Sequence, residues 1–152
     1  MVATAAIAVT LGACGGGDTP PDMAYGRDVS AETHMIISEA RFAAVYRTPE
    51  GSERKFEDIA KMIAFGTRMN QLDGAKVWVH DLDTGDWIDA STASFVVGGQ
   101  GIDTPGGGGI VAFADRGAAD AFAADHGATV RTWDELVSAP PTTSPAPSGP
   151  PM

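Results

Sequence analysis

Cysteine is almost missing from this chain, which has one, Cys14, among 152 residues. A single cysteine allows no disulfide within the chain. It also excludes a CxxC pair, and with it a zinc finger or a dithiol redox centre. Metal chemistry in this protein therefore has to use methionine, histidine, carboxylate or an unusual ligand.

Basic residues are also scarce, because 10 Lys and Arg stand against 20 Asp and Glu. The formal net charge of -10 argues against binding to nucleic acid, which needs clustered basic side chains. It equally argues against docking on anionic lipid through a basic face. We therefore expect no nucleic-acid partner, and the acidic balance is typical of a well-solvated surface.

Long hydrophobic runs are absent too, since the apolar run at 1–11 is shorter than the roughly 20 residues that span a bilayer. It matches the apolar region of an export signal. The four residues at 11–14 (Leu-Gly-Ala-Cys) are similar to a bacterial lipobox. We expect a signal segment at 1–13, a lipidated Cys14, and anchoring to the cell membrane facing the periplasm or extracytoplasmic space. The alternative is a plain N-terminal segment with a free thiol.

Composition divides the rest of the chain into three parts. Residues 14–30 contain three successive glycines and two prolines, which predicts a flexible tether. Residues 138–152 are rich in Pro, Ser and Thr, which predicts a disordered tail without a packed core. The folded domain is expected at 31–137.

Apolar periodicity inside that domain alternates between the period of a strand and that of a helix. Ile59, Met62, Ile63 and Met69 follow helical spacing, so we expect both methionines in the core. Glu57 and Asp58 are expected at the start of this helix, and not as an acid–base pair. The pattern predicts helices at 57–69 and 116–126. It predicts strands at 41–48, 76–81, 87–90, 95–97, 110–113 and 129–132, and a further short strand that ends near residue 56.

The order of these elements repeats, because strand, strand, helix, strand covers about 41–81 and again about 94–132. The predicted fold class is α+β with mainly antiparallel sheet. Two small ββαβ units, at about 31–82 and 83–137, are expected to pack together or share a sheet. Each unit has near 40 residues, at the lower edge of independent stability.

The chemistry of the chain concentrates at His34 and Met35, which stand side by side before an apolar strand. Imidazole suits copper and zinc, and thioether suits Cu(I) in particular. Adjacent side chains on a strand point to opposite faces, so a shared site requires an irregular backbone here. Met23 in the tether and His80 in a strand are further candidate ligands. The alternative for a methionine is a side chain that fills a gap in the core. The alternative for a histidine is an ordinary surface or half-buried side chain.

Several short segments stand in a specific order along the folded domain. They are 41–44, 55–59, 78–81, 87–90, and 112–113 followed by 121–123 and 126–127. Together they resemble the NosL family over about 31–137. Members of that family are lipid-anchored accessory proteins of nitrous oxide reductase, and they bind Cu(I) and deliver it for the reductase's copper–sulfur cluster. The resemblance implies a pair of ββαβ units, Cu(I) as cargo, and the reductase or its maturation machinery as partner.

The chain departs from the family pattern in two segments. Thr33 stands where the family commonly has the cysteine of a Cys-Gly-Met motif, and His34 stands at the motif's glycine. Gly106 stands where the family often has a methionine. These departures favour an alternative function, a lipoprotein that uses the same fold for protein interaction without metal. An enzyme is not expected, since neither GxSxG nor HExxH occurs.

Overall fold

The computed structural model describes residues 17–142. The predicted signal segment, Cys14 and the tail from residue 143 lie outside the described residues. Within the described residues, no helix combines the length and the apolar character needed to cross a bilayer.

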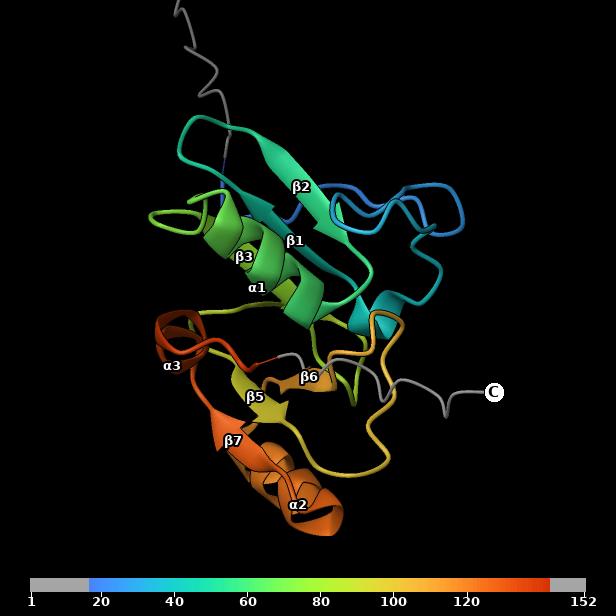
Figure 1. The fold of residues 1–152 in the computed structure, drawn as a ribbon, viewed down its shortest axis with the longest axis vertical. Coiled ribbons are helices and arrows are strands. Elements are labelled where there is room, and N and C mark those ends of the chain that lie inside the picture. The colour runs from blue at the N-terminus through green and yellow to red at the C-terminus, as the bar shows by residue number, and fades with distance from the viewer. Residues whose placement is uncertain (1–16, 143–152) are drawn as a thin grey trace, which may run out of the picture.

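The first sheet has four antiparallel strands in the order β2–β1–β3–β4. A single helix, α1, connects β2 to β3 and packs on the sheet (Figure 1). The elements are the 3-10 turn η1 (Ala40–Phe42), β1 (Ala44–Arg47), β2 (Glu53–Phe56), α1 (Ile59–Arg68), β3 (Lys76–His80) and β4 (Trp87–Asp89).

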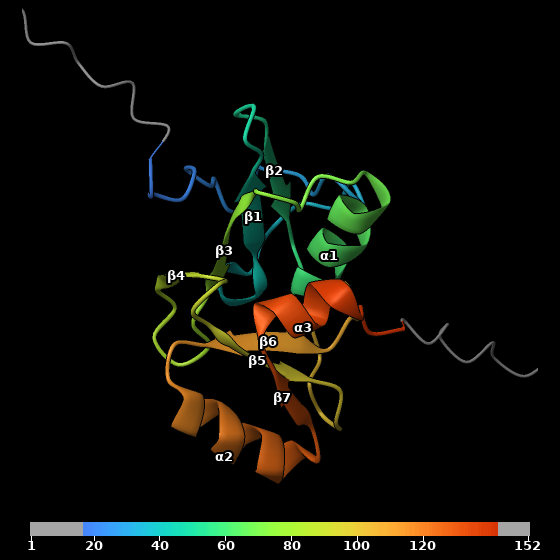
Figure 2. The ribbon, with the colours of Figure 1, turned by 90° about the vertical axis from the view of Figure 1, so that its left-hand side faces the viewer.

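The second sheet has three antiparallel strands in the order β6–β5–β7. In Figure 2, α2 lies at the lower end of the molecule, and this sheet separates it from α1 and α3. The elements are β5 (Ser94–Val97), β6 (Ile110–Phe113), α2 (Arg116–His126), β7 (Thr129–Arg131) and α3 (Trp133–Ser138).

The repeated ββαβ order is present, as β1–β2–α1–β3 and β5–β6–α2–β7. We call these the first unit and the second unit. β4 was expected within the later half, at 83–137, but it pairs with β3 of the first sheet. The short turn after β3 returns the chain directly alongside that strand. The centroids of the Trp87 and His80 rings are 3.8 Å apart.

The two units pack together through the second sheet. One face of this sheet joins the core of the first unit, because Phe95 and Ile110 pack with Phe56, Met62 and other residues of that unit. The opposite face packs on α2 through Val96, Val111, Phe113, Ala119 and Ala123. A parallel bridge between Asp81 and Ala112 connects the sheets. The predicted packing of two antiparallel units is therefore confirmed.

Helix α1 begins at Ile59, two residues later than predicted, because Asp58 is its N-cap. The Asp58 carboxylate accepts hydrogen bonds from the backbone N–H groups of Ala60 (2.7 Å) and Lys61 (3.3 Å). Met62 is fully buried, as expected. The prediction for Met69 was wrong, because it is the C-cap residue and its side chain is 50% exposed.

Helix α3 was not predicted, although its start signal stands in the sequence. The Thr132 hydroxyl accepts the N–H of Glu135 (3.3 Å), and the Glu135 carboxylate accepts the N–H of Thr132 (2.7 Å). This capping box starts a six-residue helix that buries Leu136 in the first core.

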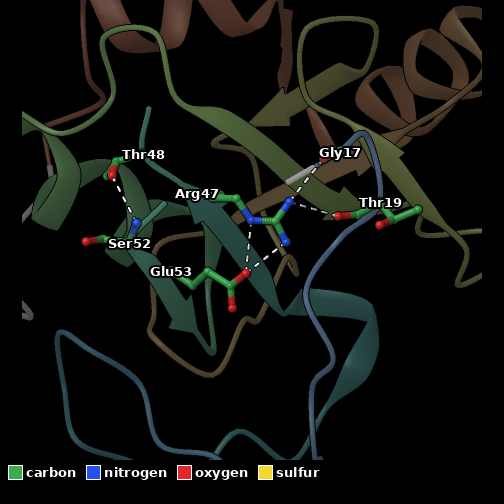
Figure 3. Close-up of polar contacts among 6 residues, drawn as sticks. All are labelled: Gly17, Thr19, Arg47, Thr48, Ser52 and Glu53. Atoms are coloured by element: carbon green, nitrogen blue, oxygen red, sulfur yellow. Dashed lines mark hydrogen bonds and ion pairs between the residues drawn. The ribbon is translucent and has the colours of Figure 1, made fainter. Parts of the chain in front are cut away.

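The described part of the predicted tether lies against the first sheet. The Arg47 guanidinium donates to the carbonyl oxygens of Gly17 (3.0 Å) and Thr19 (3.3 Å), and to Glu53 Oε1 (2.9 and 2.8 Å) (Figure 3). Further along, Lys55 of β2 binds the Asp28 carboxylate at 2.6 Å. Side chains on β1 and β2 thus hold residues that composition alone assigned to a linker.

Candidate functional site

The His34–Met35 pair lies in a tight turn that leads the chain back on itself. The N–H of Ser30 donates to the carbonyl of Met35 (2.8 Å), and the N–H of His34 donates to the carbonyl of Ser30 (3.1 Å). A bridge between Val29 and Ile36 closes the base of the turn. We call residues 30–35 the ligand turn. The side chains of His34 and Met35 are exposed on it.

His34 has a backbone φ of 60°, in the left-handed region that disfavours residues with a Cβ. The backbone at this point is therefore not a strand, and the alternation of side chains between two faces does not apply. A site shared by His34 and Met35 requires an irregular backbone of this kind.

The ligand turn is fastened at two points to the elements behind it. The Thr33 hydroxyl donates to Glu57 Oε1 at 2.7 Å and accepts the N–H of Met35 at 3.2 Å. Glu32 accepts two hydrogen bonds from the Arg68 guanidinium, at 3.1 and 2.6 Å. That contact lowers the pKa of the Glu32 carboxyl, so the pair is charged at neutral pH.

Glu57 itself is buried, with 2% of its surface exposed, just before the N-cap of α1. One carboxylate oxygen, Oε1, accepts the Thr33 hydroxyl. The other, Oε2, has no hydrogen-bond partner among the described residues. Sequence reasoning assigned Glu57 only to the start of the helix. The signal that it missed is that two acidic residues follow one another there, while a helix needs only one as its cap.

The glycine-rich loop before β6 reaches the same corner of the molecule. The Thr104 hydroxyl and the N–H of Gly106 both donate to Asp58 Oδ2, the latter at 3.2 Å. A Cβ atom at position 106 would lie 2.7 Å from the Cβ of Asp58 and 2.8 Å from Lys61 Cγ. Glycine is therefore the residue that this packing admits at 106. Thr33 thus contacts Glu57, and the loop at 104–106 contacts the adjacent residue Asp58.

His80 lies in β3 with 4% of its surface exposed. Its Nδ1 is 2.7 Å from the carbonyl oxygen of Gly85, and its Nε2 is 2.8 Å from the Tyr25 hydroxyl. Burial lowers the pKa of the His80 imidazole, which favours the neutral ring. Because a carbonyl only accepts, Nδ1 carries the proton and Nε2 accepts from Tyr25.

Met23 is partly buried, two residues before Tyr25. The structure thus shows a contact of His80 with Tyr25, to which Met23 is close in the chain, whereas His34 and Met35 are consecutive residues of the ligand turn. Over residues 17–142, no three His, Cys, Asp or Glu side chains converge as a metal site would require. A copper site on the ligand turn would draw on thioether sulfur as well.

The two packed ββαβ units, with two antiparallel sheets, define an α+β architecture. The sequence model of the NosL family matches residues 27–140, so the chain belongs to the NosL family. A crystal structure of the copper chaperone NosL from Shewanella denitrificans is similar, with 22% sequence identity and a TM-score of 0.67. The match covers 79% of this chain and 99% of that one. No curated protein matches the chain. The predicted family and fold are confirmed.

Proposed function

We propose that this chain is a copper carrier that holds Cu(I) at His34 and Met35 and delivers it for the maturation of nitrous oxide reductase. The observation that carries the proposal is an exposed imidazole and an exposed thioether on consecutive residues of the ligand turn, where His34 has a left-handed backbone. Family membership and the shared fold support it. The chemistry is binding and transfer, without catalysis.

Ligand exchange explains both holding and release. Thioether and imidazole are ligands that Cu(I) accepts at low coordination number. Half of the Met35 surface is exposed, so an incoming ligand from a partner can reach the metal and displace the thioether. Copper is cargo in this proposal, and its partner is the reductase or the machinery that assembles it.

Met23 and His80 are proposed as supplementary ligands. His80 can bind metal through Nε2 only after the Tyr25 hydroxyl has moved away from it. Tyr25 is 38% exposed and lies in the segment that also carries Met23. One movement of residues 23–25 would therefore free the imidazole and shift the second thioether.

A competition titration against a chromophoric Cu(I) chelator tests the metal site. The full chain should carry Cys14→Ser, so that the free thiol does not bind the metal. We expect one-to-one binding, weakened at least about tenfold (about 1.4 kcal/mol) by Met35→Ala. Met69→Ala is the matched control, because both side chains are 50% exposed. His34→Ala should weaken binding less than Met35→Ala. Failure to retain Cu(I) under reducing conditions would overturn the proposal.

Delivery and anchoring need a test in cells. We propose that lipidated Cys14 anchors the chain to the membrane, outside the cytoplasm. Cells that lack the chain should produce copper-poor reductase, and the wild-type chain should restore its copper content. Cys14→Ser should be released from the membrane and restore less. Equal reductase copper with and without the chain would contradict this role.

A second candidate function, protein interaction without metal, is favoured by one observation. Four large apolar side chains, Tyr25, Val29, Met35 and Ile36, are exposed within one short segment, by 38% to 55%. Exposed apolar groups of this kind mark docking surfaces. If this function is the correct one, Val29→Lys with Ile36→Lys abolishes binding of the reductase to the metal-free chain, and the titration finds no Cu(I) site.

A further inference from the structure

Within residues 17–142, Glu57 has a buried carboxyl oxygen without a hydrogen-bond partner, and its other carboxyl oxygen contacts Thr33 of the ligand turn. Its side chain is 2% exposed, and its Oε2 has no hydrogen-bond partner among the described residues. The ion pairs of two nearby elements are made with other carboxylates, since Lys55 of β2 binds Asp28 and Arg68 of α1 binds Glu32. A buried carboxylate is normally paired with a cation or coordinates a metal.

The distances place this carboxylate one hydroxyl away from the backbone that carries Met35. Thr33 Oγ1 is 2.7 Å from Glu57 Oε1 and 3.2 Å from the backbone nitrogen of Met35. A single hydroxyl therefore separates the carboxylate from the backbone of the ligand turn. Thr33 is only partly buried, and its hydroxyl is the contact between the Glu57 carboxylate and the turn.

We propose that Glu57 is itself a metal ligand, whose Oε2 binds copper held on the ligand turn once the Thr33 hydroxyl has turned aside. The donors of the site are then the carboxylate oxygen, the His34 imidazole and the Met35 thioether. Nitrogen and oxygen donors suit Cu(II), whereas thioether suits Cu(I). The site therefore holds copper in both oxidation states, with Glu57 serving Cu(II) and Met35 serving Cu(I). This inference rests on the proposed function.

Two variants with opposite expected effects on Cu(II) and Cu(I) binding test the assignment. Each is made in the full chain with Cys14→Ser. Glu57→Gln keeps the shape of the side chain and an oxygen that accepts the Thr33 hydroxyl, and removes the charge. We expect it to weaken Cu(II) binding at least about tenfold and Cu(I) binding less than about threefold. Met35→Ala should weaken Cu(I) binding more than Cu(II) binding. Glu50→Gln, at an exposed turn residue, is the matched control.

The outcomes distinguish a failure of the proposed function from a failure of this inference alone. Wild type that binds neither Cu(I) nor Cu(II) overturns the proposed function and this inference with it. Wild type that binds Cu(I), with Glu57→Gln and wild type equal toward Cu(II), overturns this inference alone. If Glu57→Gln does not fold, judged by circular dichroism, the wild type decides. Its infrared difference spectrum with Cu(II), recorded with ¹³C-labelled glutamate, should show a shifted carboxylate band, and an unshifted band overturns the inference.

Discussion

Two strand–helix junctions of the molecule can be compared, Phe56–Asp58 and Phe113–Asp115. They share their first and last residue types and differ in the residue between them. In each, a buried phenylalanine ends a strand, and an aspartate two residues later caps the following helix. The residue between them is buried Glu57 in the first unit and exposed Ala114 in the second. The phenylalanine and the aspartate are therefore common to both units, as parts of the fold. The glutamate is not common to both, and the junction that has one lies behind the ligand turn.

The surroundings of the two caps differ as well. Asp58 is fully buried and also holds Thr104 and Gly106 from the loop of the second unit. Asp115 is exposed, and among the described residues its carboxylate accepts only the N–H of Ala118, at 2.7 Å. The first junction therefore connects two parts of the fold, and the second only starts a helix.

The largest expected effect is on stability at the first cap. Asp58→Ala leaves buried N–H and hydroxyl donors without an acceptor, so we expect a loss of about 3 kcal/mol in the free energy of unfolding. Asp115→Ala should cost about 1 kcal/mol, as an exposed cap does. Urea unfolding of both variants measures the difference, and equal losses would remove the distinction between the two junctions.

Gly106→Met tests whether the loop of the second unit is locked onto the first. The new side chain would meet Asp58 and Lys61, so we expect a loss of about 2 kcal/mol from overpacking. Asp103→Met, at an exposed position of the same loop, should cost less than about 0.5 kcal/mol. Thermal or urea unfolding measures both. A stable Gly106→Met variant would show that the loop adjusts freely.

His80 of the first unit should make stability depend on pH. Its folded-state pKa is lowered by burial, so the unfolded chain binds the proton at higher pH than the folded chain does. The free energy of unfolding should therefore be highest above about pH 6.5 and fall as the pH drops below it, by at most about 1.4 kcal/mol per pH unit. His80→Leu should remove this slope, and His126→Leu should keep it. A slope that survives in His80→Leu would assign it to another group.

The smallest expected effect is a gain in stability at the ligand turn. His34→Gly relieves the left-handed backbone and should add about 0.5–1 kcal/mol to the free energy of unfolding. Asn70→Gly, at the other left-handed position that is not glycine among residues 17–142, should gain less, because asparagine tolerates this region. Urea unfolding measures the gain. A loss of stability in His34→Gly would mean that the side chain supports the turn.

The repeated pattern and the family could be predicted from the sequence because they rest on local periodicity and on ordered motifs. β4 joined the other sheet because strand pairing follows spatial proximity after a short turn, which a repeat count does not capture. The exposure of Met69 follows from the point where α1 ends, and apolar spacing does not determine that point. The burial of Glu57 arises when the ligand turn packs over it, a contact between distant segments that no local pattern encodes.

Methionine methyl resonances test the central claim, that the ligand turn is the copper site. The full chain with Cys14→Ser, labelled with ¹³C at its methionine methyl groups, would receive one equivalent of Cu(I) under reducing conditions. We expect the Met35 resonance to shift, and those of buried Met62 and exposed Met69 to stay in place. A shift at Met23 would add that residue to the site. An unmoved Met35 resonance in a chain that has bound Cu(I) would contradict the account.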